Sequence, residues 1–276
     1  AIVLLRQEQT GPAAARNAAI RHARGALLVF LDDDAVPSES CLSGHLAAQL
    51  NASGNTAVMG SFTLAEAHRN TSLSQLLETS PMAFPHPALK PGKLHRTECL
   101  RAVNMSIPTA LIEAIGGFDE TFNIPSAEDS EMAKRLGRAL ATPVLYDPEI
   151  GCSHDDMPSI DKFAQRQQRL GWSTSYMAWR HDDHTLIVGP NSSPPGEQFW
   201  EDLEARLEKS IPRIETVLAE IRTLAEQESS APPPSELASD FAEKVREIGF
   251  AFFSRGLIDG HREIQVMIAE RESPQE

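Results

Sequence analysis

The chain has 276 residues, of which 41% are hydrophobic, and a formal net charge of −14 from 25 basic and 39 acidic residues. This length suits one domain of ordinary size with an appendage. The acidic balance argues against nonspecific nucleic-acid binding and against a basic membrane-docking face. Three separated cysteines without a CxxC spacing predict neither a zinc site nor a disulfide framework, and they favour a reducing compartment. No apolar run approaches the roughly 18 residues that span a bilayer. We therefore expect a cytoplasmic protein, free or peripheral at the inner membrane face.

The N-terminal segment predicts a β-α-β succession. Residues 1–6 predict a strand, residues 12–25 a helix and residues 26–31 a second strand. Proline suits the first position of that helix and glycine its end. Such a succession predicts a parallel, helix-covered sheet, in which ligands bind at the carboxyl ends of the strands.

Three carboxylates, Asp32, Asp33 and Asp34, follow directly on the second strand. Like charges this close repel, and their burial would be costly. Because strand residues alternate, Asp32 and Asp34 can point the same way and hold a hard divalent cation, Mg²⁺ or Mn²⁺, whose partner would be a diphosphate. The alternative is a solvated cluster that caps the helix beginning near Pro37.

The middle of the chain alternates helices, strands and loops. From the apolar periodicity and the Gly and Pro positions we predict helices at 38–50, 109–115, 127–140 and 160–179, strands at 56–64, 100–106, 144–146 and 150–153, and a site-lining loop at 80–97.

Two further sets of polar residues could carry chemistry. Glu128 and Asp129 open a predicted helix, where Ser126 would be the N-cap and acids suit the helix dipole. The functional alternative is a general base at a cleft. His154 follows a predicted strand and is flanked by acids, so it could contact a metal or a phosphate, although a lone histidine is more often structural.

The composition changes after about residue 185. A linker-like segment at 190–196 precedes two amphipathic stripes, at 203–225 and 237–252, separated by a break at 229–234. Pro212 predicts a kink or a restart in the first helix. We expect a helical hairpin packed on the catalytic domain in preference to a dimerising coiled coil, and domains at 1–184 and 185–276.

Taken in order, the runs GPAAARNAAIRHARGALLVFLDDDAVP, VNMSIPTALIEAIGGFDETF and AEDSEMAKRL, with a later strand that ends in histidine, resemble the family 2 glycosyltransferases over about residues 1–180. The resemblance implies a GT-A fold, an α/β domain around a mostly parallel sheet flanked by helices, here with a C-terminal helical extension. It also implies inverting, metal-dependent transfer of a hexose from a UDP-, GDP- or dTDP-linked donor. The acceptor would be a hydroxyl of a glycan, lipid or small molecule, as in cell-envelope polysaccharide synthesis.

The same resemblance implies roles for individual residues. Asp129 would be the catalytic base, with Glu128 positioning it or the acceptor. The residues implied to hold the cation are Asp34, Asp32 and His154. Those implied to bind the donor are Arg16, Asn17, Asp32, Asp33 and Asn104. Those implied to shape the acceptor pocket are Gly117, Phe118 and Trp172.

The sequence departs from the family pattern in two places. The first strands, which bind the nucleotide base in the family, have no counterpart, so the sheet and the nucleoside pocket would be incomplete. No QxxRW motif occurs, since Gly171 stands where the arginine would be. Two alternatives stay open: a truncated, inactive interaction module with the helical tail as its working part, and a nucleotidyltransferase, which would explain the three aspartates. The chain could also form a homodimer through its C-terminal helices.

Overall fold

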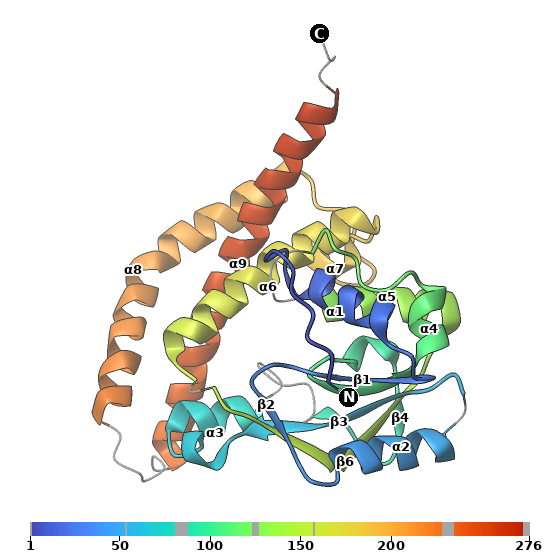
Figure 1. Cartoon of the computed structure of the whole chain (residues 1–276). Helices are drawn as coiled ribbons and strands as arrows, with labels where there is room; N and C mark the ends of the chain where they lie inside the picture. Colours follow the sequence, from blue (N-terminus) through green and yellow to red (C-terminus); the bar gives the residue numbers. More distant parts are fainter. Residues whose placement is uncertain are drawn as a thin grey trace. The chain divides into compact units, whose positions relative to one another are not determined.

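The computed structural model describes residues 2–52, 54–80, 88–122, 127–156, 158–227 and 235–272. The chain divides into two compact units, Ala1–Met157 and Pro158–Glu276. The first unit is a sheet with helices on both faces, and the second is helical (Figure 1).

The first unit contains most of the predicted elements in the predicted order, together with three helices or strands that were not predicted, at 35–37, 72–79 and 94–95. Its elements are α1 (Pro12–His22), β1 (Leu27–Leu31), β2 (Ala35–Pro37), α2 (Cys41–Asn51), β3 (Ala57–Leu64), α3 (Ser72–Thr79), β4 (Leu94–His95), β5 (Asn104–Pro108), α4 (Thr109–Ala114), α5 (Glu128–Leu140) and β6 (Val144–His154), with 3₁₀ turns at Glu66–His68 and Thr97–Cys99. The strand predicted at 100–106 thus begins four residues later. Part of the predicted loop at 80–97 lies outside the described residues.

The sheet has the strand order β1-β5-β3-β6-β2, and β4 also pairs with β6. Among the described strands only β3 and β6 pair in parallel, whereas the other four pairings are antiparallel. The α/β class and the flanking helices are confirmed, but the mostly parallel pairing expected from the sequence is not what these strands form. β1, β3 and β6 do run in one direction, yet β5 lies between β1 and β3. A β-α-β succession predicts strand direction but does not decide which strands become neighbours.

The strand predicted at residues 1–6 is absent, because residues 2–10 form no regular structure. Ile2 is fully exposed, and Val3 and Leu4 are 70% and 76% exposed. An extended segment becomes a strand only when a neighbour accepts and donates its backbone hydrogen bonds. No described strand pairs with this segment.

The alternating side chains of β3 connect two apolar layers. Met59 is fully buried on the face that α1, α4 and α5 cover, where Met132 of α5 also lies. Val58 points to the opposite face, against Cys41 of α2 and Ile150 of β6. Helices therefore bury both faces of the central strands (Figure 1).

The two strands predicted at 144–146 and 150–153 form one strand, β6, with an interrupted register. Gly60 of β3 lies opposite Asp147, whereas the next residue, Ser61, lies opposite Gly151. Residues 148–150 therefore form a bulge in β6.

The second unit consists of α6 (Ile160–Arg180), the short α7 (Thr185–Val188), α8 (Glu197–Gln227) and α9 (Ser235–Glu272). α8 continues through Pro212 without a restart and changes direction along its length (Figure 1). α9 packs along both α6 and α8. α6 thus belongs to the compact unit of the C-terminal helices, and a functional domain boundary at 184/185 stays a prediction.

Within the residues that the structure describes, none of the helices has the length and apolar character needed to cross a membrane.

Candidate active site

The three aspartates form the tight turn that joins β1 to β2. The backbone N–H of Ala35 donates to the carbonyl of Asp32 across this turn, at 3.1 Å. Asp33 at its tip is exposed, whereas Asp32 and Asp34 are partly buried. Because β2 pairs with β6, Ala35 lies opposite His154. The pairing brings the end of β6 beside the turn.

Asp32, Asp34 and His154 form one cluster. One ligand atom from each lies within 4.8 Å of the others, and His154 Nδ1 lies 3.3 Å from Asp34 Oδ2. Two carboxylates and an imidazole suit a divalent cation, and the imidazole favours Mn²⁺ over Mg²⁺, which prefers oxygen ligands alone. The residues expected to hold a cation are thus close enough to share one.

Arg16 of α1 connects this turn to the start of α5. Its Nη2 donates to Asp32 Oδ1 at 2.8 Å, and its Nη1 donates to Glu128 Oε1 at 2.5 Å. Its guanidinium carbon also lies 5.5 Å from the centre of the Phe118 ring. The forked guanidinium can bind both carboxylates at once, which a lysine could not do with the same geometry. One arginine therefore joins the aspartate turn to the Glu128-Asp129 pair.

Glu128 and Asp129 begin α5 and differ in environment. Glu128 is 6% exposed, and burial is the largest influence that raises its pKa. The neighbouring charge of Asp129 raises that pKa further, while Arg16 opposes both effects. Asp129 is more accessible and accepts a 3.3 Å hydrogen bond from the hydroxyl of Ser130. The buried glutamate thus serves the ion pair, and the aspartate is the carboxylate that solvent reaches.

Asn17 holds the glycine turn after α4. Its amide Nδ2 donates to the carbonyl of Phe118, and its Oδ1 accepts from the backbone N–H of the same residue, both at 2.9 Å. A Cβ on Gly117 would lie 2.5 Å from that Oδ1, at a φ of +80°, so only glycine fits there. Phe118 is 3% exposed and packs edge-on against Phe30 at 5.7 Å.

The other predicted site residues lie in different surroundings. Asn104 is fully buried within the sheet, and its side chain is hydrogen bonded to protein groups. Trp172 lies in α6, in the second unit, where its ring stacks on Tyr176 and its Nε1 donates to Glu263 at 2.8 Å. Its acceptor-binding role stays a prediction. Ser126, the predicted N-cap, lies outside the described residues.

Two contacts at or near the site were not anticipated from the sequence. The motif order placed Arg16 near the donor but did not reveal that it pairs with Glu128, which lies 112 residues away. His45, fully buried in α2, contacts Asn104. The sequence around His45 did not predict this contact, because an isolated histidine in an apolar helix is compatible with many roles.

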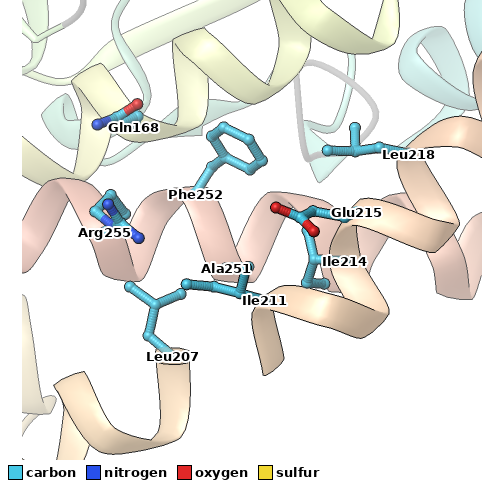
Figure 2. A pocket seen from close by; sticks show the side chains of 9 residues that line it. All are labelled: Gln168, Leu207, Ile211, Ile214, Glu215, Leu218, Ala251, Phe252 and Arg255. Atoms are coloured by element: carbon cyan, nitrogen blue, oxygen red, sulfur yellow. The ribbon is translucent and has the colours of Figure 1, made fainter. Parts of the chain in front are cut away.

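The second unit contains a separate, mainly apolar cavity of about 260 Å³ (Figure 2). Nine side chains from α6, α8 and α9 line it: Gln168, Leu207, Ile211, Ile214, Glu215, Leu218, Ala251, Phe252 and Arg255. No predicted site residue is among them.

Together, the fold and the site define a class, an α/β domain in which two carboxylates and an imidazole that could hold a cation lie at the carboxyl ends of β1 and β6. Residues 1–107 match the family model described as Glycosyl transferase family 2. The match includes the aspartate turn and Arg16, while Glu128, Asp129 and His154 lie beyond it.

Known proteins with similar sequences include the pre-mycofactocin glycosyltransferases of Mycobacterium tuberculosis strains CDC 1551 / Oshkosh and ATCC 25618 / H37Rv. Each is 26% identical over 190 residues, which cover 66% of this chain and 38% of the relative. The chain therefore matches well under half the length of these relatives.

Similar solved structures include the mannosyltransferase PcManGT from Pyrobaculum calidifontis in complex with GDP-Man and Mn²⁺. It is 18% identical with a TM-score of 0.41, over 95% of this chain and 68% of that one. S. aureus TarS is 16% identical with a TM-score of 0.37, over 92% of this chain and 43% of that one.

Proposed function

We propose that this chain carries the catalytic centre of an inverting, metal-dependent glycosyltransferase that uses a nucleotide-sugar donor. The observation that carries the proposal is the double ion pair of Arg16, which joins the aspartate turn to the Glu128-Asp129 pair. The family match of residues 1–107 and the glycosyltransferase names of the sequence relatives support the same reaction class.

The residues would divide the chemistry as follows. Asp129 takes the proton of the acceptor hydroxyl, whose oxygen attacks the anomeric carbon of the donor sugar. The bond to the diphosphate breaks as the new bond forms, so a single displacement inverts the anomeric configuration. A divalent cation held by Asp32, Asp34 and His154 would supply positive charge against the departing diphosphate. Arg16 and Glu128 hold the base and the cation site in a fixed position relative to each other.

Finer assignments belong to this proposal as well. Of the donor-contacting candidates, Asp33 is exposed, Asp32 and Arg16 are partly buried, and Asn17 and Asn104 are buried. The sugar transferred is a hexose, and the nucleotide is one of UDP, GDP and dTDP. A cytoplasmic setting, a role in cell-envelope polysaccharide and a homodimer through the C-terminal helices stay predictions.

Two other functions compete with this one. A nucleotidyltransferase would use the same aspartates and a cation, but it would release a nucleoside monophosphate unit to its acceptor. An inactive interaction module would keep the fold without binding a donor. Both alternatives make different predictions for nucleotide binding and product analysis.

The first experiment is a calorimetric titration of the chain with UDP, GDP and dTDP, each with and without Mn²⁺. We expect Mn²⁺-dependent binding of one nucleotide, which Asp34→Ala abolishes. Glu66→Ala removes an exposed carboxylate outside the site and is the matched control, expected to bind as the wild type does. Failure of all three nucleotides to bind would favour the interaction module.

Turnover of the matching nucleotide sugar then separates the enzyme classes. We expect release of nucleoside diphosphate and a sugar product of inverted configuration, detected by NMR. Asp129→Asn should bind the donor normally but lose about a hundredfold to ten-thousandfold in rate, because general bases typically contribute factors of 10²–10⁴. Transfer of a nucleoside monophosphate would contradict the proposal.

A further inference from the structure

We infer that Asn104 is a positioning residue: with Ser61 it fixes the bulge in β6, and the bulge places His154 beside Asp34. The inference rests on the proposed function only for the cation that His154 would bind. The placement of the strand itself rests on the hydrogen bonds and the register of β3, β5 and β6.

The bulge decides which residue of β6 reaches the site. Gly60 lies opposite Asp147, and Leu64 lies four residues after Gly60. In an uninterrupted ladder, Leu64 would lie opposite Gly151, which is four residues after Asp147. The observed partner of Leu64 is His154, because three extra residues form the bulge. Without the bulge, Gly151 would lie opposite Leu64, and the imidazole of His154 would not lie beside the aspartate turn.

Two side chains satisfy carbonyl groups of the bulge. Ser61 Oγ donates to the carbonyl of Pro148 at 2.8 Å. Asn104 Nδ2 donates to the carbonyl of Ile150 at 2.8 Å and to the carbonyl of Ser61 at the same distance. The amide thus bridges β6 and β3 where their register changes. A carbonyl without a hydrogen bond is costly where it is buried, as that of Ile150 is, so these bonds stabilise the bulged form.

Gly60 makes room for this bridge. A Cβ at Gly60 would overlap both Asn104 Nδ2 and the carbonyl oxygen of Ile150. Asn104 also lies opposite Leu31, the last residue of β1 before the aspartate turn. Asn104 therefore pairs through its backbone with the strand that ends in the aspartates and, through its buried side chain, binds the strand that ends in His154.

His45 fixes the orientation of the amide. Its Nε2 lies 2.9 Å from Asn104 Oδ1, while its Nδ1 is buried with no hydrogen-bond partner among the described residues. An unpaired buried N–H costs more than an unpaired ring nitrogen, so the Nε2–H tautomer donates to Oδ1. The flipped amide would point its oxygen at two carbonyl oxygens and is excluded by repulsion. His45 thereby keeps Nδ2 directed at the bulge.

The experiment compares Asn104→Ala, Ser61→Ala and the control Ser106→Ala. Ser106 is equally buried on β5 and accepts from Gln49 Nε2 at 3.1 Å, but it does not contact the bulge in any of the hydrogen bonds described. Amide hydrogen exchange of residues 151–154 is measured on the metal-free chain, Mn²⁺ binding by electron paramagnetic resonance with Mn²⁺ alone, and global stability by urea unfolding. If Asn104→Ala does not fold, the milder change Ser61→Ala tests whether these side chains fix the bulge.

We expect both bulge variants to exchange residues 151–154 at least about tenfold faster and to bind Mn²⁺ about tenfold or more weakly, the usual range for residues that orient metal ligands. Ser106→Ala should lose stability without either effect. Folded bulge variants that keep wild-type protection at 151–154 would overturn the inference. A wild-type chain that shows no Mn²⁺ binding would instead count against the metal in the proposed function, and faster exchange in the bulge variants would still support the positioning of the strand.

Discussion

At the scale of single residues, the charge balance of the site depends on Arg16. Its side chain is 17% exposed and that of Glu128 is 8% exposed, so their 2.5 Å contact lies largely out of water. Removing one partner of a buried pair leaves the other charge without compensation. Loss of Arg16 should therefore destabilise the site.

We predict that Arg16→Met lowers the free energy of unfolding by about 3 kcal/mol at pH 8. Burial already raises the pKa of Glu128 above its ordinary value of 4.5, and loss of the cation raises it further. The folded variant then holds a proton that the unfolded chain releases, so its stability falls as pH rises through the raised pKa. The loss should be smaller at pH 5 than at pH 8, because a larger fraction of Glu128 is protonated at the lower pH. Urea unfolding at both pH values measures this.

Arg21→Met is the control for that experiment. Arg21 lies in the same helix, its side chain is 64% exposed, and it contacts Glu120 at 3.7 Å. Exposed pairs contribute little, so we expect a change below about 1 kcal/mol at either pH. An equal loss for Arg16→Met at pH 5 and pH 8 would show that packing, and not the charge of Glu128, accounts for its effect.

At the scale of elements, the meeting of β3 and β6 depends on the lack of a side chain at Gly60. We predict that Gly60→Ala destabilises the fold by about 3 kcal/mol, because its Cβ would overlap the carbonyl of Ile150 and the Asn104 amide. Gly151 lies across the same register shift, and a Cβ there would lie 3.7 Å from Ser61 Oγ, an ordinary contact. Gly151→Ala should therefore change stability by less than about 1 kcal/mol. Equal effects in chemical denaturation would contradict this explanation.

At the scale of the whole molecule, the chain folds as two compact units, and the second depends on close contact between α6 and α9. Glycines on both helices let the backbones approach: a Cβ at Gly171 would overlap the carbonyl of Phe253, and one at Gly256 would overlap the carbonyl of Gln168. Ser175 Oγ also donates to the carbonyl of Leu257 at 2.8 Å. Gly171, which stands where the QxxRW motif has its arginine, is thus required for the packing of α6 on α9.

We predict that Gly256→Ala lowers the free energy of unfolding of the second unit by about 3 kcal/mol, although alanine is the better helix former by about 1 kcal/mol. The overlap with backbone cannot be relieved by a side-chain rotation, so the helices must separate. Gly196→Ala, where a Cβ meets nothing within 4 Å, is the control and should change stability by about 1 kcal/mol or less. Hydrogen exchange along α6 and α9 gives the readout, and unchanged protection in Gly256→Ala would refute the close-packing explanation.

The sequence alone determined the local features. Pro12 marked the start of α1, although the helix ends at His22, three residues before the glycine that was expected to end it. Apolar periodicity marked α5 and α6, and the order of the motifs resembled the family whose model matches residues 1–107. These features depend on neighbouring residues along the chain, so local propensity is enough to predict them. The carboxylates of the aspartate turn were recognisable for the same reason, since they follow directly on an apolar strand.

Only the tertiary structure decided what depends on contacts between distant segments. It placed β5 between β1 and β3, left residues 2–10 outside the sheet and moved His154 into position through a three-residue bulge. It also paired Arg16 with Glu128 and enclosed Asn104 among carbonyl groups. Strand order, register and ion pairing depend on which surfaces pack together and which polar groups they bury, and spacing along the chain does not encode these choices.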